Sequence, residues 1–407
     1  MKVLLINTVF GYGSTGRICS DICESLIAGG NECVCAFGRG AAPDNLKDHA
    51  YKTCGKLGVY FNAFLSRIFD NAGLCGTLST KRLIRFIKKY NPDVIHIHNL
   101  HGYYLNVKTL LKFLQKFGKP VVMTLHDCWT FTGHCAYFDN VECDGYFSGC
   151  KNCKHKSIYP KSAVFSRAAK NYKLKKKLFT SLKNVTVVTP SVWLKNLAEK
   201  SFLNKFEIKV INNGIATDEF YPIGDKEREE FLSGAIGKEL KAFSSEDKIV
   251  LAAASVWTKE KGYDDFIRLA ELLGNGYRAV MLGVTEKQKK SLNAKVTGIT
   301  RTSSLKELRE IYCAADLFVN LTYEDNYPTV NLEAQSCGTP VITYRTGGSV
   351  ESVPKENVVD KGDVVAVSEK IKSGDYQRLF DGDFDKKTAI AKYIKTYEEA
   401  INKAGNL

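Results

Sequence analysis

Short apolar runs alternate with longer amphipathic segments from one end of the chain to the other. In the first half these runs predict strands at Val3–Asn7, Glu32–Phe37, Val94–His98, Pro120–His126 and Val185–Pro190. The segments between them place apolar residues at helical spacing and predict helices at 15–28, 82–89, 108–117 and 193–202. Strands that alternate with helices in this way are typical of a parallel sheet covered by helices on both faces.

The same alternation restarts in the second half, after a turn signal at residues 212–214. It predicts strands at Ile249–Ala254, Arg278–Leu282, Leu317–Asn320 and Pro340–Thr343, and helices at 264–273, 305–315 and 329–335. We therefore expect an α/β protein with two doubly wound, Rossmann-like domains, over residues 1–208 and 209–384. The last segment, 385–407, has one apolar helical face (Ile390, Tyr393, Ile394 and Tyr397) and is expected to pack back on the first domain.

Length and hydropathy fit this organisation. The chain has 407 residues, which suits roughly two domains of ordinary size. No apolar run approaches the ~20 residues that a membrane-spanning helix needs. Residues 1–10 lead into glycines without a small-residue cleavage site, so we interpret them as a core strand and expect a cytoplasmic protein.

Positive charge is concentrated in the first half. Residues 1–205 hold 30 Lys and Arg against 12 Asp and Glu, whereas residues 206–407 hold 28 against 32. This asymmetry favours an anionic partner for the first domain, such as nucleic acid, a phosphorylated lipid or an anionic bilayer. The alternative is a solvated basic surface without a partner.

The densest candidate chemistry lies at 323–341, where a strand end, a polar loop and a helix start follow one another. Free amide groups at that helix start, near Tyr327, Pro328 and Thr329, could hold a diphosphate. The carboxylate of Glu333, one turn into the helix, could reach ribose hydroxyls, and Asp325 on the loop could accept hydrogen bonds from a sugar. The alternative is an ordinary helix packed on a sheet, whose N-terminus is stabilised by nearby acidic residues.

This stretch resembles the donor motif of the retaining glycosyltransferases of family 4. That motif is an acidic residue, seven further residues, then Glu and Ala, followed by Gly-x-Pro-Val; Asp325, Glu333 and Gly338–Val341 have this spacing, with Asp where most members have Glu. The resemblance implies the GT-B fold, in which two Rossmann-like domains face a cleft, and catalysis without a metal ion. It extends to bacterial capsule and exopolysaccharide enzymes of the colanic-acid type.

The resemblance also assigns roles to basic residues of the second domain. Lys261, in the pair Lys261-Gly262, offsets the charge of the leaving diphosphate and is catalytic together with Asp325. The family's arginine, five residues before this pair, is replaced by Val256, and Lys259 is the nearby residue that could substitute. Arg301 is expected to line the base pocket, without distinguishing uridine from guanosine.

The glycine-rich loop after the first strand carries Gly13 and Gly16. Together with Gly11, their spacing also fits a dinucleotide-binding fingerprint, but the end of the second strand lacks the acidic residue which that fold uses. The family resemblance instead places this loop beside the donor phosphates.

Histidines mark the acceptor side of the first domain. The segments 93–106 and 124–129 resemble acceptor-domain motifs of polysaccharide-building members, which implies a catalytic His126 and acceptor-side roles for His98 and His101. Strand histidines are otherwise more often satisfied core residues.

Five of the thirteen cysteines crowd into the loop 128–155, and four of them, Cys135, Cys143, Cys150 and Cys153, have the spacing Cys-x7-Cys-x6-Cys-x2-Cys. A Cys-x2-Cys pair with two nearby thiolates suits a closed, tetrahedral, structural zinc site. The alternative is a set of reduced cysteines in a loop.

The sequence thus predicts a retaining glycosyltransferase that uses a UDP- or GDP-type donor and a glycan or polyprenyl-diphosphate-linked acceptor in surface polysaccharide synthesis. It is expected to lie in the cytoplasm, peripheral to an anionic membrane, and not to bind nucleic acid. Two alternatives use some of the same features: a zinc-containing nucleic-acid-binding protein, and a nucleotide-sugar epimerase of the same fold.

Overall fold

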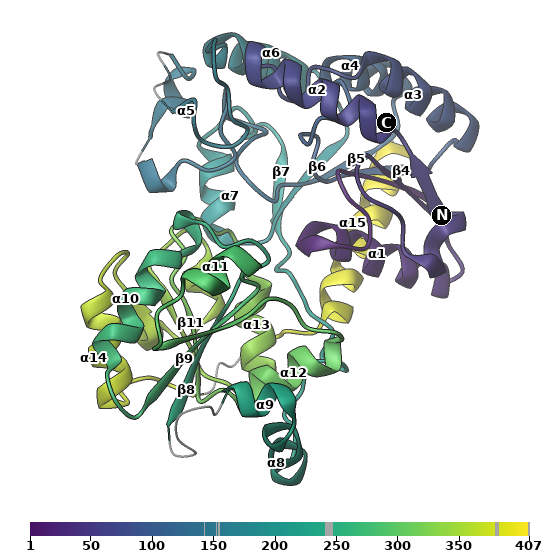
Figure 1. Cartoon of the computed structure of the whole chain (residues 1–407). Coiled ribbons are helices and arrows are strands. Elements are labelled where there is room, and N and C mark those ends of the chain that lie inside the picture. The colour runs from purple at the N-terminus through teal and green to yellow at the C-terminus, as the bar shows by residue number, and fades with distance from the viewer. Residues whose placement is uncertain (142, 152, 154, 241–246, 379–381, 406–407) are drawn as a thin grey trace. The chain divides into compact units, whose positions relative to one another are not determined.

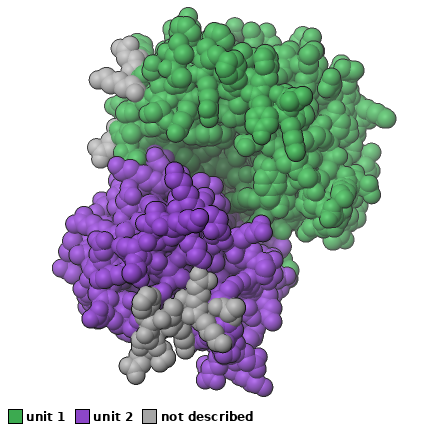
Figure 2. All heavy atoms as spheres, viewed as in Figure 1, with its two compact units in different colours: residues 1–212, 387–407 green, residues 213–386 purple. Residues whose placement is uncertain are grey.

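The computed structural model describes residues 1–405 except 142, 152, 154, 241–246 and 379–381. The described chain divides into two compact units, and Figure 2 draws each in its own colour. The first unit comprises residues 1–212 and 387–407, and the second comprises residues 213–386. The chain therefore leaves the first unit at the turn that the sequence pattern marks and returns to it at its end.

A parallel sheet of seven strands forms the centre of the first unit within the described residues. The strands are β1 (Lys2–Asn7), β2 (Glu32–Phe37), β3 (Ala50–Lys52), β4 (Val94–Ile97), β5 (Val121–Thr124), β6 (Val185–Thr189) and β7 (Glu207–Val210). Their order, β3-β2-β1-β4-β5-β6-β7, places β1 beside β4 and reverses the direction of winding between them. That reversal is the topological switch point at which doubly wound sheets bind ligands.

Helices cover both faces of this sheet. They are α1 (Gly13–Ala28), α2 (Lys56–Phe69), α3 (Thr77–Tyr90), α4 (Val107–Phe117), α5 (Gly145–Ser148), α6 (Ala168–Thr180), α7 (Val192–Glu199) and α15 (Lys386–Gly405). Strand side chains alternate between the faces, so one apolar cluster joins β1 to α3, α4, α6 and α7, while a second joins it to α1 and α15. Figure 1 shows α2 in the same layer as α3, α4 and α6.

The last helix, α15, belongs to the core of the first unit. Its residues Ile390, Tyr393 and Tyr397 are buried in the cluster that contains Val3 and Leu5 of β1. Tyr397 also hydrogen-bonds, through its hydroxyl, to the imidazole of His96 on β4. A segment from the end of the chain thus completes the first domain.

The second unit repeats the design. Its described residues form a parallel sheet of six strands: β8 (Lys248–Ala253), β9 (Tyr277–Leu282), β10 (Val296–Ile299), β11 (Leu317–Asn320), β12 (Val341–Tyr344) and β13 (Val358–Val359). Their order is β10-β9-β8-β11-β12-β13, so the switch point lies between β8 and β11. The helices are α8 (Asp225–Ser233), α9 (Ala235–Leu240), α10 (Tyr263–Leu273), α11 (Glu286–Ser291), α12 (Leu305–Ala314), α13 (Thr329–Ser336) and α14 (Val364–Ser373).

No helix among the described residues is both long and apolar enough to cross a membrane.

Candidate functional site

Most of the donor residues predicted in the second unit follow the two strands that flank its switch point. After β8 the chain makes a short 3-10 helix, Lys259–Lys261, and continues into α10. After β11 it makes a polar loop, 321–328, and continues into α13. The loops are joined by a hydrogen bond from the Tyr323 amide to the Glu260 carbonyl, 2.8 Å long. Both sets of predicted residues therefore lie at one edge of the sheet.

Lys261 and Asp325 form an ion pair at this edge. The Nζ atom of Lys261 lies 2.7 Å from Oδ2 of Asp325 and donates to the Glu324 carbonyl at 3.3 Å. Both side chains keep some solvent exposure, 39% for the lysine and 21% for the aspartate. A partly exposed ammonium that is held in place by a carboxylate remains available to an anionic ligand.

Steric crowding explains why a glycine follows Lys261. Gly262 has φ +75°, and a Cβ atom built there would lie 2.2 Å from the carbonyl oxygen of Leu321 at the end of β11. Any other residue would push the two loops apart. The Lys-Gly pair therefore fixes the ammonium against the neighbouring strand end.

The helix start beside this ion pair suits a phosphate. Pro328 occupies the N-cap position of α13, where it has no side chain that could accept a hydrogen bond from the helix, and Thr329 is the first helical residue. Uncapped amide groups and the positive end of the helix dipole favour an anion at such a position. Tyr327, just before it, is buried, and burial first and Glu351 next raise its pKa to about 12, so its phenol stays protonated.

Glu333 is buried on the first turns of α13. It is 6% exposed, and its Oε2 accepts a hydrogen bond of 2.9 Å from the hydroxyl of Tyr312 on α12. That hydrogen bond holds the carboxylate in one orientation. Tyr312 is a residue that the sequence pattern did not single out, because a buried aromatic residue on an amphipathic helix is typical of core packing.

Two predicted donor residues are not brought to this cluster by any interaction of the described residues. Lys259 is exposed at the start of the 3-10 helix, and Arg301 is exposed on the loop before α12. Val256, which stands where the family has arginine, is 65% exposed. The role of Lys259 as a substitute for that arginine stays a prediction.

The glycine loop of the first unit is built around β1 and the start of α1. The side-chain amide of Asn7, which is fully buried, donates to the carbonyls of Val9 and Thr15, and the Gly11 amide donates to the Gly16 carbonyl. Gly13 has φ +64°, and a Cβ atom there would meet nothing within 4 Å. The chain therefore has open space beside Gly13, and α1 begins without a side-chain cap.

His98 and His126 lie together at the ends of β4 and β5. Nδ1 of His98 is 2.9 Å from Nε2 of His126, and the rings are stacked with centroids 5.2 Å apart. Burial lowers the pKa of His126 to about 4, and it lowers that of His98 well below its usual value. Both imidazoles are therefore neutral near pH 7. The Nε2 atom of His98 is buried and has no hydrogen-bond partner among the described residues.

His101 is paired with Asp127 instead. Its Nε2 lies 2.7 Å from Oδ2 of Asp127, and its Nδ1 lies 3.3 Å from the Tyr159 hydroxyl. Burial alone would raise the pKa of Asp127, but His101 and the amide of Trp129 outweigh it and hold this pKa below its usual value. The sequence pattern points to His101, but it assigns no role to Asp127, its partner.

The four predicted zinc ligands lie in one loop region, but the described residues contain no group of three or more His, Cys, Asp or Glu arranged to hold a metal ion. Glycine amides donate to two of the sulfurs, from Gly133 to Cys150 at 3.1 Å and from Gly145 to Cys143 at 3.4 Å. Burial, and then the neighbouring thiols, raise the pKa of Cys135 to about 12, so in this arrangement its thiol is protonated. The zinc site stays a prediction.

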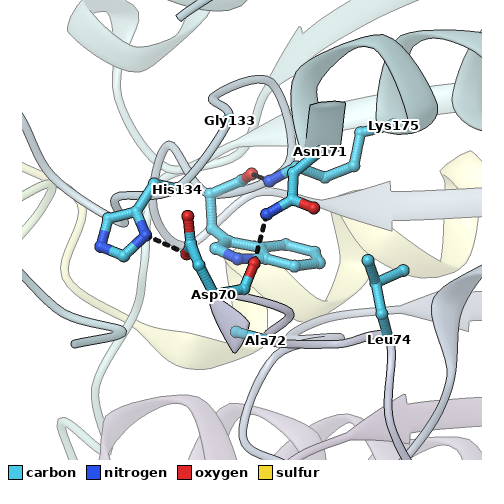
Figure 3. Close-up of a pocket in the computed structure, with 8 residues that line it drawn as sticks. Asp70, Ala72, Leu74, Gly133, His134, Asn171 and Lys175 are labelled. Atoms are coloured by element: carbon cyan, nitrogen blue, oxygen red, sulfur yellow. Dashed lines mark hydrogen bonds and ion pairs between the residues drawn. The ribbon is translucent and has the colours of Figure 1, made fainter. Parts of the chain in front are cut away.

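Next to the cysteine loop lies a small internal pocket (Figure 3). His134 pairs with the carboxylate of Asp70 there, and Asn171 donates to the Asp70 carbonyl. Lys175 is buried, donates to the Trp129 carbonyl and lies 3.9 Å from the centroid of the Trp129 ring. Burial lowers the pKa of Lys175 to about 7. These contacts fasten the cysteine loop to α6 and to the turn after α2, so we interpret the pocket as structural.

Comparison with known proteins agrees with this arrangement. The family model described as Glycosyltransferase Family 4 matches residues 15–219, just over half of the chain. A second model, described as Glycosyl transferases group 1, matches residues 238–374 and so includes Lys261, Asp325 and Glu333. The first model covers most of the first unit, and the second model covers most of the second unit.

Two curated relatives have names that refer to the synthesis of surface polysaccharides. A protein of Escherichia coli named as a colanic acid biosynthesis glycosyl transferase, WcaC, is 26% identical over 87% of this chain and 86% of its own. A Bacillus subtilis protein named as a teichuronic acid biosynthesis glycosyltransferase, TuaC, is 29% identical over 37% of this chain and 36% of its own.

Solved structures share the fold over nearly the whole chain. A glycosyltransferase of Rickettsia africae aligns with a TM-score of 0.65 at 15% identity, covering 98% of both chains. Anabaena HepE, solved in complex with UDP and glucose, aligns with a TM-score of 0.62 at 14% identity, covering 98% of this chain and 100% of that one. The expected GT-B fold of two Rossmann-like domains is confirmed, and the chain belongs to glycosyltransferase family 4.

Proposed function

We propose that this glycosyltransferase moves a sugar from a nucleoside-diphosphate donor to a glycan acceptor, with retention of configuration, during the synthesis of a surface polysaccharide. The observation that carries the proposal is the Lys261–Asp325 ion pair beside the uncapped start of α13, at the switch point of the second unit. The named roles of WcaC and TuaC support the polysaccharide, and the UDP complex of HepE supports a uridine donor.

Each residue of this cluster has a distinct role in the proposal. The amides at the start of α13 and the ammonium of Lys261 bind the diphosphate, and the ammonium offsets the charge that develops on it as the sugar leaves. Asp325 holds that ammonium and accepts hydrogen bonds from sugar hydroxyls. Glu333, oriented by Tyr312, binds the ribose hydroxyls. The acceptor attacks on the face from which the diphosphate departs, so catalysis consists mainly of positioning and charge stabilisation.

The acceptor residues are the histidines of the first unit. Because His126 is neutral near pH 7, it can accept a hydrogen bond from a hydroxyl group as well as donate one. An acceptor linked to a lipid diphosphate would bring further negative charge to this basic unit. The relative from Streptococcus pneumoniae that is named as an alpha-galactosylglucosyldiacylglycerol synthase, 27% identical over 35% of this chain and 45% of its own, supports a lipid-linked acceptor.

A thermal-shift experiment with UDP, GDP, ADP, their sugar conjugates and NAD tests the donor site. A nucleotide at ~100 times its dissociation constant should stabilise the folded chain by about 2.7 kcal/mol. We expect one nucleoside diphosphate to do so in the wild type and in Lys306→Met, an exposed lysine on α12, but far less in Glu333→Gln. A shift with NAD alone, or with no nucleotide, contradicts the proposed donor site.

Product analysis separates transfer from epimerisation of the donor sugar. A transferase leaves the sugar of its donor unchanged when no acceptor is present, apart from slow hydrolysis. A new nucleotide sugar that forms without acceptor would instead show an epimerase.

We also propose that Cys135, Cys143, Cys150 and Cys153 hold a structural zinc ion. The amide donors to Cys143 and Cys150 would stabilise bound thiolates, although the described geometry does not assemble a ligand set. Elemental analysis of the purified chain should find about one zinc per molecule, and Cys150→Ser with Cys153→Ser should lose it. Cys54→Ser, a buried cysteine in the same unit, is the control. Metal-free wild-type protein with all four thiols reactive would contradict the site.

A further inference from the structure

Helix α2 presents apolar residues to solvent and polar residues to the protein. Leu57, Tyr60, Phe61 and Phe64 are 85%, 73%, 62% and 60% exposed, and their spacing places them on one face. On the opposite face Asn62 is only 6% exposed, and its side-chain amide donates to the Tyr103 carbonyl. This exposed apolar face of the helix is therefore not used by the fold.

A neighbouring segment extends this exposed face. Residues 162–165 run along the end of α2, where the amides of Ala163 and Phe165 donate to the carbonyls of Arg67 and Ile68. The ring of Phe165 stacks on Phe69, with centroids 6.1 Å apart and planes within 2°. We call the resulting surface the apolar strip; it consists of Leu57, Tyr60, Phe61, Phe64, Phe69, Val164 and Phe165, all exposed. Exposed apolar residues that gather in this way are typical of interaction sites.

The charge around the apolar strip has one sign. Lys56, Arg67, Lys161 and Arg167 are exposed beside it. Helices α2, α3, α4 and α6, which share one layer of the first unit (Figure 1), contain many lysines and arginines and no aspartate or glutamate. On the other face of the same sheet, α1 and α15 carry both signs. The basic excess of the first half of the chain is therefore concentrated on the face that exposes the apolar strip.

We propose that this face docks on an anionic lipid bilayer, with the apolar strip inserted at the level of the headgroups and the surrounding lysines and arginines on lipid phosphates. A uniformly basic surface complements a uniformly anionic one, and leucine and aromatic side chains on one helical face favour insertion into the interface. Nucleic acid would match the charge but would leave an aliphatic residue such as Leu57 without a role. The inference does not depend on the identity of donor or acceptor, because its readout is lipid binding.

Vesicle sedimentation of the full chain tests the proposal. We expect binding to phosphatidylcholine vesicles that contain phosphatidylglycerol in about 0.1 M salt, and much weaker binding in about 1 M salt or without the anionic lipid. The variant Leu57→Ser, Phe61→Ser, Phe64→Ser should weaken binding at least about tenfold while keeping the melting temperature, since these side chains are exposed. The matched control, Leu305→Ser with Val365→Ser, removes exposed apolar residues of the second unit and should bind as the wild type does.

A charge variant separates the electrostatic contribution to vesicle binding from the contribution of apolar insertion. Lys81→Gln with Arg85→Gln on α3 should weaken vesicle binding about tenfold and reduce its salt dependence. Wild-type binding by the triple serine variant would overturn the insertion of α2. Failure of the wild type to bind anionic vesicles at low salt would overturn the surface as a whole. Binding of single-stranded DNA in place of vesicles would assign it to nucleic acid, and a dimer that the triple serine variant dissociates would assign it to a second copy of the chain.

Discussion

The first six strands of the two sheets follow the same order, but the ends of these strands carry very different chemistry in the two units. In the second unit, a partly exposed lysine and aspartate meet beside a helix start that has no side-chain cap. In the first unit, the ends of β4 and of its neighbour β5 carry His98 and His126, which are neutral near pH 7. An anionic diphosphate needs a fixed positive charge, whereas an alcohol acceptor needs only hydrogen-bonding groups. In the proposed function, the same fold therefore serves two kinds of ligand through the residues at its strand ends.

The largest expected effect comes from removing the charge of the second site. Lys261→Met should lower kcat/KM about 10²–10³-fold, because removing one group that stabilises the developing charge costs about 3–4 kcal/mol. Transfer rates measured with the preferred donor check this, with Lys306→Met as the control. Lys259→Met sharpens the comparison: a loss of similar size would show that Lys259 replaces the missing arginine, and an unchanged rate would contradict that role.

The next effect concerns the buried hydrogen bond between His101 and Asp127 in the first unit. Asp127→Asn should lower the free energy of unfolding by about 3 kcal/mol, because it leaves His101 buried without its charged partner. Urea denaturation measures this loss. Asp44→Asn breaks an exposed ion pair in the same unit and should change stability far less. Equal effects of the two substitutions would contradict a structural role for the His101–Asp127 pair.

Acidification should affect the first unit and spare the second. His96, His98 and His126 have pKa values below those of the unfolded chain, so the unfolded chain binds more protons as the pH falls below about 6.5. Their contribution is fully present above that pH and is lost as the pH falls toward 4, by about 1–3 kcal/mol. The second unit contains no histidine. Protection factors from hydrogen exchange, which correct for the slower intrinsic exchange at lower pH, should therefore fall between pH 7 and pH 5 more in β4 and β5 than in β8 and β11. A uniform change would contradict the assignment.

The smallest effect concerns the orientation of Glu333. Tyr312→Phe removes one hydrogen bond to the buried carboxylate and should cost about 1 kcal/mol of donor binding, roughly a fivefold rise in KM. Little change in kcat is expected, because the tyrosine acts through the glutamate. Steady-state kinetics with varied donor separates the two constants. A loss in kcat without a change in KM would contradict this role.

Much of the fold followed from the sequence. Runs such as Leu317–Asn320 and Glu32–Phe37 are strands in the structure with the predicted bounds, because a buried parallel strand needs a continuous apolar run. Short or more polar elements escaped the pattern. The strand β13, Val358–Val359, has two residues and no periodicity of its own, and α2 hides its polar residues inside. A pattern search that expects apolar residues to face the core does not find a helix whose exposed face is largely apolar.

The sequence by itself determined which residues carry the charge and at what spacing: Asp325 and Glu333 eight positions apart, and Lys261 directly before a glycine. Only the tertiary structure decided their partners. Lys261 meets Asp325 because β8 and β11 are neighbours in the sheet, although dozens of residues separate them along the chain, and His101 meets Asp127 because β4 lies beside β5. Residue spacing describes the geometry within one segment of the chain. Contacts between distant segments depend instead on strand order, which arises from packing of the whole domain.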